Sequence, residues 1–103
     1  MYKLEYLPLA LQDLHEITSY IADTLKVPQA AIDLLDDLDS FISRLRQFPY
    51  SCKIYQTEKP LKTEYRMLTV NNYLVFYVVM EHTVEIHRII YARMDYDKFI
   101  GED

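Results

Sequence analysis

Residues 64–79, EYRMLTVNNYLVFYVV, place one arginine inside a run of aromatic and β-branched residues. Arg66 lies between Tyr65 and Met67, where a strand with a purely structural role would carry an apolar side chain. Its guanidinium is a planar donor that matches phosphate oxygens in a two-pronged contact. We therefore expect Arg66 to be exposed on a sheet face, where it meets water or a partner.

Two more arginines, Arg88 and Arg93, occur in or near the predicted last strand. In the predicted meander only one strand lies between this strand and the strand of Arg66. If side chains alternate, Arg93 shares a face with His87, while Arg88 points the other way unless a bulge intervenes. Arginines grouped with a histidine would suit phosphate binding. The structural alternative is that these arginines simply solvate an open sheet face, which is common. Glu64 would then pair with Arg66, although it could also act as a base.

The histidines and the single cysteine give weaker evidence of a reactive site than the arginines do. His87 is the one histidine near the arginines, whereas His15 falls on a predicted helix and His82 in a predicted turn. Cys52 is the only cysteine, so no internal disulfide can form, and the histidines lack zinc-ligand spacing. With one glycine in the chain and no GxSxG motif, glycine-rich nucleotide folds and nucleophilic hydrolases are excluded. We expect no metal and no cofactor.

The first half of the chain reads as one strand followed by two helices. Residues 2–7 alternate apolar and charged side chains, the period of a half-buried strand. Pro8 suits the first turn of a helix over 8–25, with leucines and isoleucines at helical spacing. Pro28 starts a second helix that Pro49 ends, whose expected apolar stripe has eight residues: Ala31, Leu34, Leu35, Leu38, Phe41, Ile42, Leu45 and Phe48.

The second half reads as a loop and a three-strand meander. Residues 49–61 contain two prolines and show no clean period, so we predict a loop with one short strand near 53–55. Three β-type segments come after it, and Asn71–Asn72 between the first two could form a type I′ turn. The expected fold is α+β: a strand, a helical hairpin and an antiparallel meander, with the helices on one face of a four-stranded sheet and the other face partly open.

Length and charge narrow the class of protein. The 103 residues are expected to form a single domain, 1–103, and no apolar run reaches the ~18 residues of a membrane span. We therefore expect a cytoplasmic protein. Residues 1–48 carry four basic and eight acidic side chains, a net charge of −4, whereas residues 49–93 carry six and four, a net of +2. This asymmetry favours an anionic partner for the middle of the chain, or else simply a solvated acidic helix pair.

The order of these elements resembles a known family. The runs YLPLALQDLHEITSYIADTL, RLRQFP, YRMLTVNNYLVFYVV and VEIHRIIYARMDY are similar, in order and spacing, to the RelE/ParE toxin superfamily of bacterial toxin–antitoxin modules, which includes plasmid stabilization proteins. The resemblance covers residues 2–97. It implies a RelE-like fold and a toxin that is neutralised by an antitoxin, whose helix or tail covers the open sheet face.

The resemblance also implies which residues would act. In the RelE-like branch the toxin enters the ribosome and cleaves mRNA, and Arg66, Arg93 and Tyr96 match its catalytic positions. RNA-binding residues would be Lys53, Lys59, Lys62 and His87. Asp95 stands where some members have a histidine. The basic loop favours this mRNA endoribonuclease. The acidic net charge of −5 favours the alternatives, a ParE-like toxin that blocks DNA gyrase without catalysis or an inactive remnant that binds the antitoxin.

Overall fold

The element order agrees with the prediction. The fold was determined as a computed structural model that describes residues 1–57, 61–94 and 100. The elements are β1 (Lys3–Tyr6), α1 (Pro8–Ser19), a π-helical turn η1 (Tyr20–Thr24), α2 (Pro28–Ser43), a 3₁₀ turn η2 (Arg44–Arg46), β2 (Arg66–Val70), β3 (Tyr73–Val79) and β4 (Thr83–Tyr91). Among these residues no helix is long and apolar enough to cross a membrane.

The four strands form one mixed sheet in the order β1-β4-β3-β2, in which β1 runs parallel to β4 and the other pairs are antiparallel. Two rows of paired residues mark its ends. At one end Arg66 pairs with Tyr77, which pairs with Ile86; we call this the Arg66 end. At the other, Val70 and Tyr73 are paired next to the β2–β3 turn, and we call this the Asn71 end.

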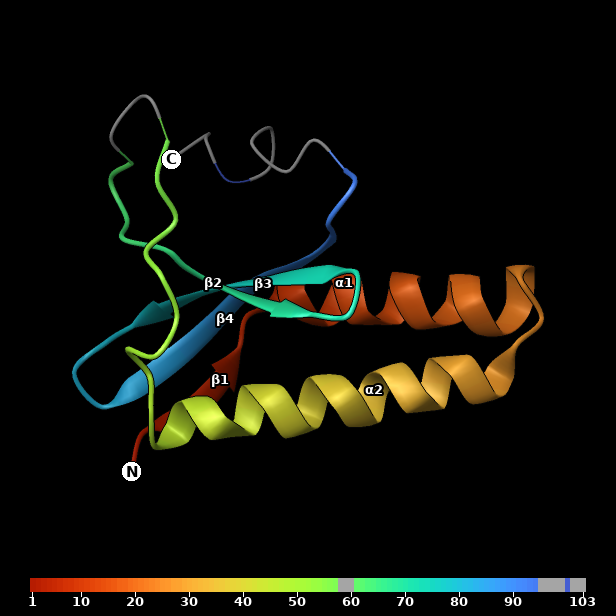
Figure 1. Cartoon of the computed structure of the whole chain (residues 1–103), viewed down its shortest axis with the longest axis horizontal. Helices are drawn as coiled ribbons and strands as arrows, with labels where there is room; N and C mark the ends of the chain where they lie inside the picture. The colour runs from red at the N-terminus through yellow and green to blue at the C-terminus, as the bar shows by residue number, and fades with distance from the viewer. Residues whose placement is uncertain (58–60, 95–99, 101–103) are drawn as a thin grey trace.

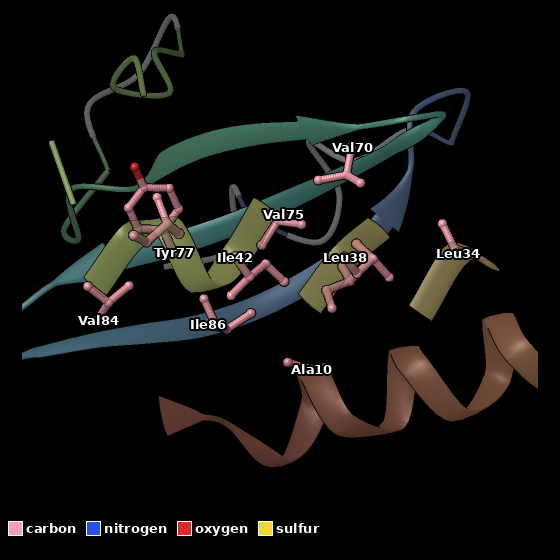
Figure 2. Packing of buried hydrophobic residues seen from close by; sticks show 11 residues of the cluster. Ala10, Leu34, Leu38, Ile42, Val70, Val75, Tyr77, Val84 and Ile86 are labelled. Carbon is pink, nitrogen blue, oxygen red and sulfur yellow. The ribbon is translucent and has the colours of Figure 1, made fainter. Parts of the chain in front are cut away.

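Both helices cover the same face of the sheet, as predicted (Figure 1). Figure 2 shows the core between the helices and the sheet, where Leu34, Leu38 and Ile42 of α2 face Val75, Tyr77 and Ile86 of the strands. The expected apolar stripe of the second helix is too wide, because three of its members are exposed: Leu35, Phe41 and Phe48. A narrower stripe suffices because the sheet contacts only one side of the helix.

The opposite face of the sheet is more covered than expected. Phe76, Leu74 and Ile90 of the strands form a second buried cluster there with Tyr65 and Ile100. In Figure 1 the loop after α2 starts at the end of that helix, on the side of the helices, and crosses to the other side of the sheet, where Tyr55 and Leu61 contact the second cluster. The loop therefore acts as a partial third layer.

Two residues in the connections between elements have a positive φ although neither is glycine. Lys26 has a φ of 59° in the interhelical turn, and Asn71 has a φ of 53° in the β2–β3 turn. Asn72 has no positive φ, so the predicted type I′ turn, which needs positive φ at both residues, is wrong. The short strand expected near 53–55 is a single bridge between Ile54 and Arg66.

Candidate functional site

Arg66 is held by the loop rather than presented to solvent. Its Nη1 donates a 2.7 Å hydrogen bond to the backbone carbonyl of Cys52. Its guanidinium carbon lies 4.9 Å from the ring centroid of Tyr50. Only 15% of the side chain is exposed. The prediction that Arg66 is exposed is therefore wrong, because the sequence pattern could not show that the loop bridges to this residue.

The side of the sheet on which Arg66 lies also differs from the expectation. Its strand neighbours Leu68 and Val70 both contact the core beneath the helices, and its cross-strand partner Tyr77 is buried in that core. Since alternate residues of a strand share a face, Arg66 lies on the helix-covered face. Tyr77 donates a hydrogen bond of 2.8 Å to the carbonyl of Pro49 beside it. Burial raises the pKa of the Tyr77 phenol, so this group stays a neutral donor.

Arg93 lies at the opposite end of the sheet from Arg66. It is exposed, two residues beyond Tyr91, which pairs with Tyr73 at the Asn71 end. The four residue steps from Arg66 to Val70 in β2 span roughly 13 Å at ~3.3 Å per residue. The structure therefore does not bring Arg66 and Arg93 together around one phosphate. Tyr96, the third residue predicted as catalytic, lies outside the described residues.

The predicted RNA-binding lysines are only partly placed. Lys53 is exposed and lies beside Arg66, because its carbonyl accepts a hydrogen bond from the amide of Met67. Lys62 is exposed at a cavity of about 430 Å³ within the loop. Lys59 lies outside the described residues. The structure thus brings one lysine close to Arg66.

His87 occupies a β-bulge on the face away from the helices. Phe76 pairs with Arg88 and Tyr77 with Ile86, so His87 is the extra residue between them. Its Nε2 lies 3.1 Å from Oε1 of Glu85, and its ring packs edge-on against Tyr65. Because of the bulge, His87 and Ile89 lie on opposite faces of the sheet. The prediction that His87 shares a face with Ile89 and the alternate residues up to Arg93 is therefore wrong. An imidazole–carboxylate pair can transfer protons, but the side chain of Arg66, which lies at the same end of the sheet, is on the opposite face.

Asp13 is a buried charge that was not among the predicted site residues. Its carboxylate accepts hydrogen bonds of 2.9 Å from Nε and from Nη2 of Arg88, and a third of 2.9 Å from the amide of Ile89. The hydrogen bonds that Arg88 donates to Asp13 raise the pKa of the Arg88 guanidinium. Asp13 lies three residues after the buried Ala10, so a charge at a core position of α1 was the available signal. This contact fixes α1 against the part of β4 that extends beyond β1.

Within residues 1–57, 61–94 and 100, no three His, Cys, Asp or Glu side chains are grouped so that they could hold a metal ion. The groups at the Arg66 end are already hydrogen-bonded to the loop backbone, and the exposed Arg93 is remote from them. Of the residues predicted as catalytic, the two whose place the structure gives, Arg66 and Arg93, therefore do not form one site.

Comparison with known proteins identifies the family. Residues 4–96 match the model of the ParE toxin of the type II toxin–antitoxin system parDE. A search of the curated proteins gave no match. A solved chain described as the chromosomal ParDE TA system from P. aeruginosa is 22% identical, with a TM-score of 0.73. That alignment covers 90% of this chain and 98% of the other, so the two share a fold.

Proposed function

The chain belongs to the ParE toxin family of type II toxin–antitoxin systems, and from this membership we propose that it inhibits DNA gyrase by direct protein contact, without catalysis. In this proposal an antitoxin is its partner in the cytoplasm, and it needs neither a metal nor a cofactor. The resemblance found in the sequence includes this mode of action as one of two branches. The placement of the arginines is what favours it over the other branch.

The observation that carries the proposal is the distance between Arg66 and Arg93. In an mRNA endoribonuclease of the RelE-like type, both guanidinium groups would have to contact one scissile phosphate. Here they lie at opposite ends of the sheet, and Arg66 already donates to the carbonyl of Cys52. Moving Arg66 to a phosphate would leave that carbonyl without this donor. A toxin that acts by contact requires no such rearrangement.

The charge of the chain supports the same choice. RNA binding depends strongly on the neutralisation of phosphates by basic side chains. The chain has a net charge of −5, and its helical hairpin is strongly acidic. Repulsion from ribosomal RNA would therefore oppose entry into the ribosome.

The second candidate function is ribosome-dependent mRNA cleavage. It is favoured by Lys53, which is exposed beside Arg66, and by the His87–Glu85 pair. Under this alternative Arg66, Arg93 and Tyr96 would be catalytic, and Lys53, Lys59, Lys62 and His87 would bind RNA. The two candidate functions predict different effects of the purified protein: inhibition of DNA supercoiling by gyrase, or cleavage of mRNA on ribosomes.

The test measures gyrase supercoiling and mRNA cleavage with the same purified protein. We expect purified toxin to reduce supercoiling of relaxed plasmid by gyrase in a dose-dependent manner and to leave mRNA on programmed ribosomes intact. Arg93→Ala, a change at an exposed residue, should keep its fold and separate the candidates further, since it must abolish cleavage if the nuclease function is correct. Cleavage by the wild type with unchanged supercoiling would overturn the proposal. Normal growth upon soluble expression without antitoxin would show that the chain is an inactive remnant.

A further inference from the structure

A basic region lies where α2 passes into the loop. Residues 40–57 contain Arg44, Arg46 and Lys53 and no aspartate or glutamate, although the whole chain has a net charge of −5. All three basic side chains are exposed. In the part of the chain that the structure describes, no ion pair involves any of them. An anionic group could therefore bind these cations without breaking an existing ion pair.

Large aromatic side chains lie among the three cations. Phe48 is 62% exposed and Tyr50 is 59% exposed. The guanidinium carbon of Arg44 lies 4.8 Å from the ring centroid of Phe41, near the end of α2. Single apolar side chains on a surface need no explanation, but a group of them indicates an interaction surface. We call this surface the basic patch and define it by six residues: Phe41, Arg44, Arg46, Phe48, Tyr50 and Lys53.

Contacts between distant segments bring the patch together. The amide of Tyr2 donates a 2.8 Å hydrogen bond to the carbonyl of Arg46. A hydrogen bond with the Tyr50 side chain raises the pKa of the Tyr2 phenol, so these two rings are neighbours. The Tyr50 ring also contacts Arg66, beside which Lys53 lies. Figure 1 shows the end of α2 and the start of the loop close to the N-terminus. The patch is therefore continuous from α2 to the edge of β2.

The turn that carries the aromatic side chains is preformed. The amide and the hydroxyl of Ser51 both donate to the carbonyl of Phe48, at 3.2 Å and 2.8 Å. The amide of Phe48 donates to the carbonyl of Arg44 at 3.0 Å, which ties the turn to the end of α2. Pro49 is buried, and its carbonyl accepts the hydrogen bond from Tyr77. A partner would therefore lose little free energy in ordering the backbone of this surface.

The residue types of the patch indicate a protein partner. Arginine, tyrosine and phenylalanine are enriched in protein interfaces, and arginine and tyrosine are frequent among the residues that contribute most to binding. Rings that exclude water around a guanidinium strengthen its hydrogen bonds to a carboxylate. The basic patch offers both kinds of group side by side.

The charge around the patch limits the size of an anionic partner. The helix that leads into the patch, α2, carries four exposed aspartates: Asp33, Asp36, Asp37 and Asp39. A DNA duplex has one charge per ~1.7 Å of its length, so a duplex that extended beyond the patch along α2 would be repelled by these carboxylates. A second copy of a chain with a net charge of −5 would be repelled too. A short acidic segment of a folded protein presents its charge at the patch alone and is complementary to it.

We propose that the basic patch is the surface with which the toxin contacts gyrase, and that it docks a segment of that enzyme rich in aspartate and glutamate. Arg44, Arg46 and Lys53 pair with its carboxylates, while Phe48 and Tyr50 pack against apolar side chains between them. This inference rests on the proposed function for the identity of the partner. It places the contact with the target at the end of α2, outside the open sheet face that the family resemblance assigns to the antitoxin.

Two charge reversals test the location. Arg46→Glu, in the patch, should weaken the binding of purified gyrase by about tenfold or more, measured by surface plasmon resonance. Lys26→Glu, at an exposed position in the interhelical turn, changes the net charge equally. We expect this control to bind within about twofold of the wild type. Arg46→Gln, which removes the charge without reversing it, should weaken binding in the same direction but less, and melting temperatures verify that all three variants are folded.

A matched pair of truncations tests the aromatic part of the patch. Phe48→Ala removes the most exposed ring of the patch and should weaken gyrase binding by about tenfold. Ile32→Ala removes an exposed apolar side chain from α2, away from the patch, and should bind like the wild type. Inhibition of supercoiling should weaken in parallel with binding for each variant.

A fluorescent reporter tests the chemistry of the partner without gyrase. Since the chain has no tryptophan, Phe48→Trp gives a single reporter in the patch, and Ile32→Trp gives one outside it. A short glutamate–leucine peptide should shift the emission of the Phe48→Trp protein only. A lysine–leucine peptide of the same pattern and a short DNA duplex should shift neither reporter.

Three results would overturn the inference. Equal weakening by Arg46→Glu and Lys26→Glu would mean that binding depends on net charge rather than on the patch. A larger emission shift with the DNA duplex than with the acidic peptide would mean that nucleic acid occupies the patch. Self-association of the wild type that Arg46→Glu abolishes would mean that the acidic hairpin of a second copy occupies it.

The inference and the proposed function fail in different ways. A wild type that inhibits gyrase, together with Arg46→Glu and Phe48→Ala variants that bind gyrase normally, contradicts the inference alone. A wild type that neither binds nor inhibits gyrase contradicts the proposed function and, with it, the identity of the partner. In that case the peptide experiment still shows whether the patch binds an acidic segment.

Discussion

The two ends of the sheet differ in how far their tyrosine side chains are buried. At the Arg66 end, Tyr77 is completely buried and bonds to the Pro49 carbonyl, and Arg66 bonds to the Cys52 carbonyl. At the Asn71 end, Tyr20 and Tyr91 are exposed around a groove. One end thus uses polar and aromatic groups of its strands to hold the loop, whereas the other leaves its tyrosines exposed.

The difference arises from the chain segment that adjoins each end of the helical hairpin. After α2 the chain passes over the Arg66 end, where its backbone carbonyls accept hydrogen bonds from the sheet. At the Asn71 end the helices are joined by a tight turn at Lys26 and Val27, and no loop is left to cover their tip. An arginine in a strand can therefore be structural, while a tyrosine at the end of a helix, such as Tyr20, can stay exposed.

The largest test of this comparison replaces one tyrosine at each end. Tyr77→Ala should reduce the free energy of unfolding by about 3–5 kcal/mol, because it removes a buried ring and leaves a cavity. Tyr20→Ala should change it by no more than about 0.5 kcal/mol, since the ring is mostly exposed. Urea denaturation measures both values. Similar losses for the two variants would show that the Asn71 end is packed like the core.

The same comparison can be made with arginines, where the expected effect is smaller. Arg66→Ala removes a charged hydrogen bond to the Cys52 carbonyl and should cost about 1.5–3 kcal/mol. The exposed Arg93→Ala should cost about 0.5 kcal/mol or less. The melting temperatures of both variants, measured by circular dichroism, test this difference. An unchanged melting temperature for Arg66→Ala would mean that this arginine is free to act on another molecule.

Much of the fold was predictable because its signals are local. Pro8 and Pro28 start the two helices as expected, and the β-type segments on either side of Asn71 and Asn72 form neighbouring strands. Each of these signals depends on backbone geometry within a few residues. The family resemblance, which depends on the order of the elements, was confirmed for the same reason.

The candidate site was less predictable because it depends on contacts between distant segments. The carbonyl that binds Arg66 lies fourteen residues earlier in the chain, and no side-chain pattern encodes a backbone acceptor. The bulge at His87 shifts the alternation of β4 by one residue, which no periodicity in the sequence reveals. The groove at the Asn71 end depends on how far the helices extend beyond the sheet. Asp13 alone gave a usable signal, a charge at a core position.

The smallest predicted effect tests whether the β2–β3 turn at the Asn71 end is held rigidly. Asn71 has a φ of 53°, a region that costs a residue with a Cβ atom roughly 1 kcal/mol but costs glycine nothing. Asn71→Ala and Asn71→Gly both remove the hydrogen bond to Asp37, so the difference between them isolates the backbone. We expect the alanine variant to be about 1 kcal/mol less stable than the glycine variant in urea denaturation. Asp37→Ala, which removes the hydrogen bond alone, gives the remaining contribution. If alanine and glycine prove equally stable, the turn relaxes without cost, and this end of the sheet is not held rigidly by the conformation of Asn71.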